Sequence, residues 1–430
     1  MQVAFPKLEE LQLSWINVDI IWYTSITSSY IEKLTKLIIE NCDNLEYLFT
    51  SSMARDLVML GHLEIGGCKK MGKVLFTENE AENGNLIFPQ LRILEIKSLP
   101  KLERFCHGNY IKFPCLSRLL IKSCPVLKTF ISSSSSFDTG TPPLFDAKAT
   151  FPSLEELKLA YNDNMKEIWH GQHMGDYFPK LKVLELIRFP EQLVTQPFVF
   201  QSPNLEKLLV SRAPFQEIFK CQGLGGVEKP APALIQLSGL SLSELHELTC
   251  LWKEESNLES VFSNLKILEV LRCRKLKNLV PSFISFKNLT TLEVSDCHEL
   301  INLIEYSTAK SMVQLTRMGI SECHMLKEIM ACVDDEAKDG IVFSRLKYLQ
   351  LCGLPRLASF CSGSCSFEFE SLEEVIVMGC PNMKIFSHGE CSTPKKLQLV
   401  KLTKYGDEGF WEGNLNYTVQ KMFIEKPFVC

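Results

Sequence analysis

One spacing of leucines recurs along all 430 residues of the chain and limits the folds open to it. Residues 113–130, FPCLSRLLIKSCPVLKTF, show it clearly. Taking Leu116 as position 0, aliphatic residues follow at +3 and +5, a cysteine at +8, and apolar residues at +11 and +14. The leucines that begin a copy, which we call anchors, are Leu8, Leu34, Leu60, Leu91, Leu116, Leu154, Leu181, Leu205, Leu237, Leu265, Leu289, Leu315, Leu346, Leu372 and, less regularly, Leu397. Their mean separation is about 28 residues, which is a repeat of supersecondary size.

The spacing within each copy predicts a short strand. Positions +3 and +5 point to the same side of a strand, so both can face a core, while +2, +4 and +6 face away from it. Copies of this length with this pattern are typical of leucine-rich repeats, in which successive coils stack and their strands pair in parallel. We therefore predict an α/β solenoid, a leucine-rich-repeat horseshoe with a parallel concave sheet of about 14–15 short strands and an irregular convex side.

The cysteines fit a packing role at one phase of the repeat. Of 17 cysteines, seven stand at +8: Cys42, Cys68, Cys124, Cys273, Cys297, Cys323 and Cys380. Cysteine is small, tolerates burial and carries a weak S–H donor, so it can line the turn that follows the strand. Other copies have Leu99, Asn162, Phe189, Leu245 or Leu354 there. This mixed column cannot be a continuous metal or disulfide ladder, and we expect a reduced, intracellular chain.

The regular spacing sets the expected domain organisation. Residues 1–404 are predicted to form the solenoid, and residues 405–430 a C-terminal capping segment with a short helix over about 415–423. The longest polar insertion makes 131–150 a possible kink in the solenoid. The first coil would expose an apolar face, so we expect the start at Met1 to be artificial or that of a fragment.

Candidate chemistry is sparse. The net charge of −5 argues against a nucleic-acid partner, and no apolar run is long enough to span a bilayer. There is no G-x-x-x-x-G-K-[ST] motif, and the glycine-rich residues 223–229 are better explained as an insertion. His170 and His173, and likewise Cys361 and Cys365, lack further ligands nearby in sequence. We predict no catalytic residue, cofactor or metal, and hence no enzyme.

The remaining candidate for function is the exposed surface beside the strands. Exposed aromatic and arginine residues are enriched in protein-binding hot spots. The residues of this kind at positions +2, +6 and +7, expected on the concave face, are Trp15, Lys122, Tyr161, Arg188, Arg212, Arg272 and Arg317. They predict a surface that binds proteins.

The repeats resemble a known family. The pattern FPxLxxLxIxxCxxLxxxF, together with the tail WEGNLNYTVQKMF, is similar to the C-terminal leucine-rich repeats of plant nucleotide-binding disease-resistance proteins of the coiled-coil class. The resemblance implies the sensor region of an intracellular immune receptor. Such a region recognises a pathogen effector or a guarded host protein, and restrains the receptor's nucleotide-binding switch.

The resemblance also carries expectations about location and assembly. It implies a cytoplasmic chain, or one in the nucleus or at the periphery of the plasma membrane, which is a monomer when isolated. The alternative is the substrate-recognition repeats of an F-box-type ubiquitin-ligase adaptor, which share the repeat pattern and its cysteine.

Overall fold

The structure is a computed structural model, and it describes most of the chain in two compact units. The described residues are 7–22, 31–77, 85–108, 110–132, 143–162, 165, 168–169, 177–188, 204–219, 236–252, 262–280, 284–332, 340–403, 406 and 408–425. Unit 1 comprises residues 1–196 and 200–205, and unit 2 comprises residues 197–199 and 206–430.

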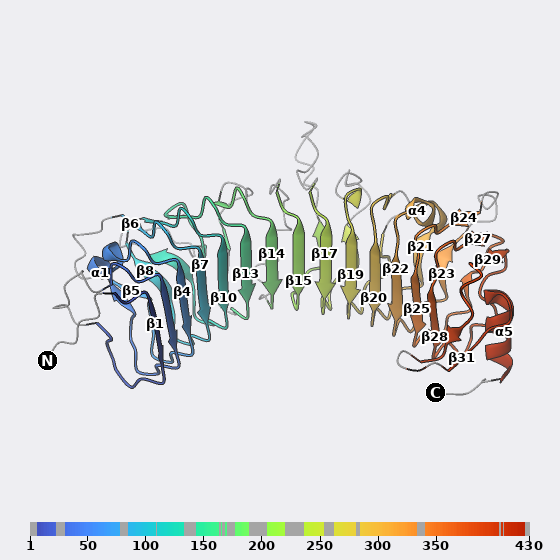
Figure 1. The fold of residues 1–430 in the computed structure, drawn as a ribbon, viewed down its shortest axis with the longest axis horizontal. Coiled ribbons are helices and arrows are strands. Elements are labelled where there is room, and N and C mark those ends of the chain that lie inside the picture. The colour runs from blue at the N-terminus through green and yellow to red at the C-terminus, as the bar shows by residue number, and fades with distance from the viewer. Residues whose placement is uncertain are drawn as a thin grey trace. The chain divides into compact units, whose positions relative to one another are not determined.

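Unit 1 is built on a parallel sheet of five-residue strands, one from each coil (Figure 1). In spatial order these are β1 (Glu10–Ser14), β2 (Lys36–Glu40), β4 (His62–Gly66), β7 (Ile93–Lys97), β10 (Arg118–Lys122), β13 (Glu156–Ala160) and β14 (Val183–Ile187). Equivalent repeat positions pair directly. For example, Leu119 lies opposite Leu94 on one side and Leu157 on the other.

Unit 2 continues the same design. Its main strands are β15 (Lys207–Ser211), β17 (Gly239–Ser243), β19 (Ile267–Leu271), β20 (Thr291–Ser295), β22 (Arg317–Ser321), β25 (Tyr348–Cys352), β28 (Glu374–Met378) and β30 (Val400–Lys401). A final strand, β31 (Gly409–Phe410), pairs antiparallel with β30. Each anchor leucine of the sequence precedes one parallel strand, which confirms the predicted leucine-rich-repeat solenoid.

The core consists of rows of equivalent side chains. The residues at +3 and +5 are buried in the inner coils: Leu119, Ile121 and Leu292 are 0% exposed, and Val294 is 1% exposed. A second row comes from the phenylalanine three residues before the anchor. The rings of Phe88, Phe113 and Phe151 follow one another with centroids 5.4 Å apart. Stacking of coils thus places like residues against like.

The side away from the main sheet carries short parallel strands that the repeat spacing did not predict. In unit 1 they form β3 (Phe49–Thr50) with β5 (Leu75–Phe76), β6 (Leu86–Ile87) with β9 (Ile111–Lys112) and β12 (Ala149–Thr150), and β8 (Arg104–His107) with β11 (Thr129–Ser132). In unit 2 they form β16 (Glu217–Phe219) with β18 (Cys250–Trp252), β21 (Asn302–Glu305) with β23 (Glu328–Ala331) and β26 (Ser359–Cys361), and β24 (Ile341–Val342) with β27 (Phe367–Glu368) and β29 (Cys391–Ser392).

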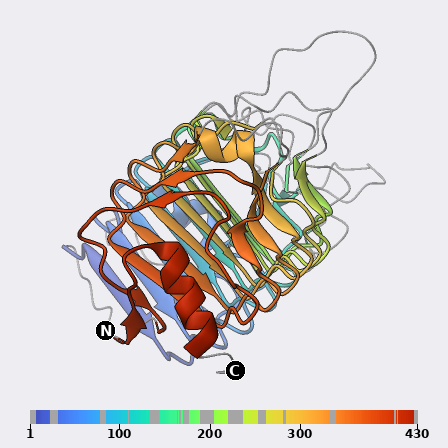
Figure 2. The same ribbon diagram turned by 90° about the vertical axis from the view of Figure 1, so that its right-hand side faces the viewer.

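Helices are short. α1 (Ser51–Asp56) lies in unit 1, and α4 (Tyr306–Ser311) and α5 (Leu415–Glu425) lie in unit 2. The helix predicted over 415–423 is confirmed and extends to Glu425, at the C-terminal end of unit 2 (Figure 2). It buries Leu415, Val419 and Met422. None of the described helices combines the length and the hydropathy that crossing a bilayer requires.

Candidate interaction surface

The most regular feature of the surface is a left-handed turn, which follows each strand of the main sheet from β1 to β28. The residue at +7 has a positive φ in each coil from Trp15 to Gly379, and we call these residues the turn row. Its members are Trp15, Asn41, Gly67, Ser98, Ser123, Tyr161, Arg188, Arg212, Glu244, Arg272, Asp296, Glu322, Gly353 and Gly379. The φ of the non-glycine members lies between 53° and 61°, a region that L residues rarely adopt.

Two kinds of hydrogen bond hold these turns, the second where a cysteine stands at +8. The +7 N–H donates to the +6 carbonyl of the next coil, as from Tyr161 to Ile187 at 2.9 Å. The +8 cysteine then donates its S–H back to the +6 carbonyl of its own coil, as from Cys273 to Leu271 at 3.6 Å. The packing role predicted for the +8 cysteines agrees with these contacts. Burial raises the pKa of the Cys273 thiol to about 11, so it stays protonated near neutral pH.

Asn162 occupies the +8 position in one coil and makes stronger bonds than cysteine does. Its Oδ1 accepts the N–H of Cys124 at 3.0 Å, and its Nδ2 donates to the carbonyl of Ile121 at 3.3 Å. The side chain is fully buried, so these bonds replace water for two groups of the neighbouring coil.

The seven residues predicted from the sequence fall in two places. Trp15, Tyr161, Arg188, Arg212 and Arg272 belong to the turn row, so they border the sheet instead of standing on its face. Lys122 is the last residue of β10, and Arg317 is the first residue of β22. The correction has a physical basis: a left-handed residue redirects the chain at +7, and the strand alternation stops there.

In unit 1 the structure brings together two of the predicted residues. The guanidinium carbon of Arg188 lies 5.8 Å from the ring centroid of Tyr161, which is within cation–π range. Trp15 stands at the turn after β1 with 77% of its surface exposed. These side chains give unit 1 large groups at the surface that a partner could bury.

In unit 2 the turn row carries alternating charges from Arg212 to Asp296. Arg212 holds Glu244 through two nitrogens, at 2.8 and 3.1 Å. Arg272 lies 3.5 Å from Glu244 and 3.7 Å from the Asp296 carboxylate. The hydrogen bond from Arg212, aided by both guanidinium charges, lowers the pKa of Glu244 below its usual value. Glu244 is therefore charged at neutral pH and neutralises part of the arginine charge.

A second chain of charges crosses the face of the main sheet in unit 1, and we call it the sheet-face ion chain. It consists of Glu64, Lys97, Glu95, Arg118, Glu156, Lys158 and Glu185, drawn from β4, β7, β10, β13 and β14. Lys97 pairs with Glu64 at 2.8 Å and also with Glu95. Lys158 lies 2.9 Å from both Glu156 and Glu185.

The carboxylates of this chain outweigh the cost of burial for its lysines. Burial alone disfavours the charge of Lys158, yet Glu185 and Glu156 together raise its pKa above the usual value. The same balance raises the pKa of Lys97. Both lysines therefore keep their charge near neutral pH.

The sheet face of unit 2 has an arginine at its centre. Arg317 pairs with Glu293 on β20, and its guanidinium carbon lies 3.9 Å from the ring centroid of Tyr348 on β25. Next to this face, a hollow of about 440 Å³ opens between the last coils and α5. Its lining includes Met378, Met422 and Phe423.

The sequence prediction missed the carboxylates of the sheet face. Glu64, Glu95, Glu185 and Glu293 all stand at +4, between two buried aliphatic residues. The signal was present as the repeated triplet Leu-Glu-Ile, Leu-Glu-Leu or Leu-Glu-Val. Because the prediction selected aromatic and basic residues only, it overlooked the carboxylates that pair with them.

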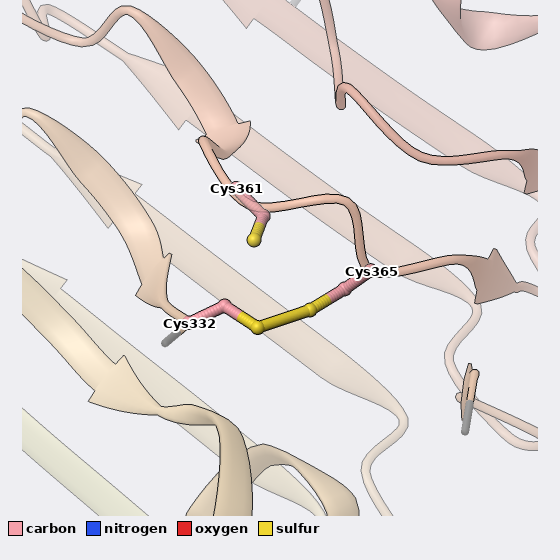
Figure 3. Close-up of side chains that lie close together, drawn as sticks. All are labelled: Cys332, Cys361 and Cys365. Carbon is pink, nitrogen blue, oxygen red and sulfur yellow. A yellow bond between two sulfur atoms is a disulfide. The ribbon is translucent and has the colours of Figure 1, made fainter. Parts of the chain in front are cut away.

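A cysteine cluster lies apart from this surface, among the short strands of unit 2. Cys332 and Cys365 form a disulfide, and Cys361 lies beside them (Figure 3). The expectation of a wholly reduced chain is therefore wrong for this pair. The sequence showed only Cys361 and Cys365, because Cys332 comes from the preceding coil and joins them through stacking. His170, His173 and the glycine-rich residues 223–229 lie outside the described residues.

Comparison with known proteins supplies the wider context. A family model described as plant disease resistance protein RPS2-like, leucine-rich repeats, matches residues 7–139, 153–285 and 282–404. A protein of Arabidopsis thaliana named as a candidate disease resistance protein, At4g10780, is 29% identical over 149 residues. That match covers 32% of this chain and 16% of the relative, so the chain spans a small part of that protein's length.

Solved structures of low sequence identity also align with the chain. The internalin InlF of Listeria monocytogenes is 14% identical, with 79% of this chain and 86% of that chain covered and a TM-score of 0.34. The Arabidopsis receptor kinase HAESA, solved with the peptide hormone IDA and the co-receptor SERK1, is 14% identical, with 87% and 74% covered and a TM-score of 0.25. The fold assignment depends on the strand pairing of this chain, not on these alignments.

Proposed function

Because the chain belongs to the RPS2-like leucine-rich-repeat family of plant disease resistance proteins, we propose that it is the protein-binding sensor region of an intracellular immune receptor. Its partner on the sensing side would be a pathogen effector or a host protein that the effector modifies. Its partner on the receptor side would be a nucleotide-binding domain, which it would restrain until the sensing partner binds.

The observation that carries this proposal is the surface formed by the sheet face and the turn row. In unit 1 alone, the seven main strands at about 4.8 Å spacing span roughly 30 Å, a width suited to a protein rather than a small molecule. Aromatic and arginine side chains border this area, and such residues dominate binding energies at protein interfaces.

The arrangement of charge supports selective binding. The carboxylates and cations of the turn row in unit 2 alternate, so a partner must present a complementary order of charges to replace these internal pairs. Mismatched charges across an interface are costly, which favours one partner over others. Nucleotide binding is assigned to the partner domain, because the chain contains no phosphate-binding motif.

The proposal is tested by comparing two triple variants. The first reverses the turn row, with Arg188→Glu, Arg212→Glu and Arg272→Glu. The second is a matched control, with Lys128→Glu, Lys277→Glu and Lys327→Glu, whose exposed lysines all lie at +12 beyond the turn. Each change should alter the free energy of unfolding by no more than about 0.5 kcal/mol.

The measurement is affinity purification from plant tissue with each chain as bait, followed by titration of every candidate partner in purified form. We expect at least one partner to bind the original chain and the control but to lose affinity for the turn-row variant. Each chain should also be co-expressed with the nucleotide-binding domain of a plant resistance protein. We expect the original chain and the control to suppress cell death more strongly than the turn-row variant does. Equal affinity of all three baits for every partner would refute the surface assignment.

A further inference from the structure

The cysteine cluster of unit 2 brings together three sulfur atoms from two neighbouring coils. The ligand atoms of Cys332, Cys361 and Cys365 all lie within 4.8 Å of one another (Figure 3). Cys361 and Cys365 are fully buried, and Cys332 is partly exposed. The arrangement follows from parallel pairing of β23 with β26, in which Met330 lies opposite Cys361 and the chain after β23 runs beside the loop 361–365.

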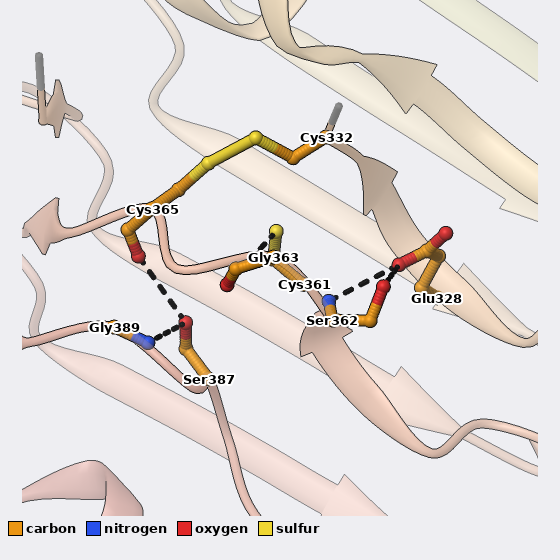
Figure 4. The surroundings of a disulfide bond; sticks show 8 residues. All are labelled: Glu328, Cys332, Cys361, Ser362, Gly363, Cys365, Ser387 and Gly389. Atoms are coloured by element: carbon orange, nitrogen blue, oxygen red, sulfur yellow. Dashed lines mark hydrogen bonds between the residues drawn. A yellow bond between two sulfur atoms is a disulfide. The ribbon is translucent and has the colours of Figure 1, made fainter. Parts of the chain in front are cut away.

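The loop is shaped to admit Cys332. Residues 361–365 read Cys-Ser-Gly-Ser-Cys, and a Cβ added at Gly363 would come within 2.9 Å of the Cβ of Cys332. Hydrogen bonds from neighbouring residues also fix the loop. The Glu328 carboxylate accepts one bond from the backbone N–H of Ser362, at 3.1 Å, and another from the Ser362 hydroxyl (Figure 4). On the other side, the Ser387 hydroxyl donates to the Cys365 carbonyl at 3.5 Å.

A disulfide accounts for two of these sulfur atoms but not for the third. Cys332 and Cys365 are sufficient to form the disulfide, yet a third cysteine, Cys361, is fully buried beside them. Three thiolates around one point suit a soft metal ion, since thiolate ligands select zinc and similar ions over hard cations. Tetrahedral bonds of about 2.3 Å to zinc place sulfur atoms roughly 3.8 Å apart. After reduction the sulfur atoms of Cys332 and Cys365 must separate to reach this spacing, which is still shorter than the 4.8 Å within which all three ligand atoms already lie.

We propose that the reduced form of this cluster is a zinc site in which Cys332, Cys361 and Cys365 supply three thiolate ligands and a water molecule supplies the fourth. Formation of the site begins with reduction of the Cys332–Cys365 disulfide by a dithiol. The dithiol gives up two electrons and two protons and becomes a disulfide itself. Zn²⁺ then displaces one proton from each of three thiols and forms three zinc–sulfur bonds.

The consequence is a metal link between two coils of unit 2. The ion would hold the end of β23 against the loop that joins β26 to β27, in place of the disulfide. Because the metal binds the folded arrangement and not the separated coils, it should stabilise the reduced chain by mass action.

The test uses the whole chain, reduced with a phosphine and handled without oxygen, and titrated with Co²⁺ as the probe. We expect thiolate-to-cobalt charge-transfer absorption that saturates at one equivalent and disappears when Zn²⁺ is added. Cys361→Ser and Cys332→Ser should abolish the absorption, whereas Cys115→Ser, which removes an exposed cysteine elsewhere, should leave it unchanged.

A second measurement does not depend on variants. Zn²⁺ should slow the alkylation of Cys332, the partly exposed member of the cluster, in the reduced chain, as read by mass spectrometry, and should leave the exposed Cys115 equally reactive. It should also raise the melting temperature of the reduced chain. No saturable absorption, or an unchanged alkylation rate of Cys332, would show that the cluster forms only a disulfide.

Discussion

At the scale of single residues, the turn after each strand determines how the coils stack. Position +7 supplies the left-handed residue and position +8 the buried group that satisfies the +6 carbonyl. Cysteine does so with a weak S–H donor, whereas Asn162 bonds both an N–H and a carbonyl of the neighbouring coil. The side chain at +8 therefore sets how strongly one coil is tied to the next.

The Asn162 bonds make a direct prediction. Asn162→Ala removes both bonds and leaves the buried N–H of Cys124 without its acceptor, which costs about 1–3 kcal/mol. Asn162→Cys should restore part of the loss, because cysteine fills this position elsewhere. Urea denaturation curves of the three chains measure the difference, and equal midpoints would contradict it.

The turn row makes a second prediction at this scale. Ser123 has a φ of 57°, which glycine adopts freely and which β-branched residues avoid. Ser123→Gly should be neutral or stabilise by up to about 1 kcal/mol, and Ser123→Val should destabilise by at least about 1 kcal/mol. Thermal unfolding of both variants checks the order; a more stable valine variant would show that the turn is not strained.

At the scale of elements, charges tie neighbouring strands together on their exposed side. The sheet-face ion chain spans five strands of unit 1, and Glu95 lies near its middle with only 8% of its surface exposed. A carboxylate so nearly buried is stabilised by its two partners, Lys97 and Arg118. The Lys36–Glu10 pair, which lies outside this chain and is more exposed, should contribute much less.

This contrast predicts unequal costs for removing the carboxylate charge of Glu95 and that of Glu10. Glu95→Gln removes the charge that two cations share and should lower the free energy of unfolding by about 1–2 kcal/mol. Glu10→Gln, at the more exposed Lys36–Glu10 pair, should cost less than about 0.5 kcal/mol. Chemical denaturation of both variants gives the comparison, and a larger cost at Glu10 would refute this account.

The turn row of unit 2 should confer a dependence on acidity. The pKa of Glu244 is lower in the folded chain than its usual value of 4.5, so folding favours the charged form. The stability that this pairing contributes is present above the unfolded pKa and is lost as the pH falls through the folded pKa. Glu244→Gln should therefore be less stable than the original chain at about pH 7 and equally stable at about pH 3. Denaturation midpoints of the two chains, measured at both pH values, test the sign of this difference in stability.

At the scale of the whole molecule, each coil depends on its neighbours for burial. Inner coils have a neighbour on both sides, and their rows are fully buried, as at Leu292. In the first described coil, Leu11 and Leu13 are only half-buried. The stability of a stacked array is close to a sum of coil and interface contributions, so position along the array should matter.

The same truncation should therefore cost more inside the array than at its end. Leu292→Ala is expected to lower the free energy of unfolding by about 2–5 kcal/mol. Leu11→Ala, at the equivalent +3 row of the first described coil but half-buried, should cost clearly less. Calorimetry of the two variants measures the free energy of unfolding that each has lost. Equal losses would argue against a dependence of each coil on its neighbours.

The sequence predicted the strands well because a single period determines both spacing and burial. Each anchor leucine led to a strand, and the helix near Leu415 formed as expected. The turn row was missed because only Gly67, Gly353 and Gly379 signal a left-handed residue there, while the other positions carry ordinary side chains. The cysteine cluster could not be found because Cys332 lies 33 residues from its disulfide partner and approaches it only through stacking.

The turn row has a consequence for how this chain can change over generations. Its backbone bonds are made by N–H and carbonyl groups, which every residue except proline supplies, so the side chains there do not build the scaffold. Tryptophan, serine, arginine, glutamate and glycine already occupy equivalent sites. Selection can therefore revise this strip one position at a time, while the architecture beneath is kept.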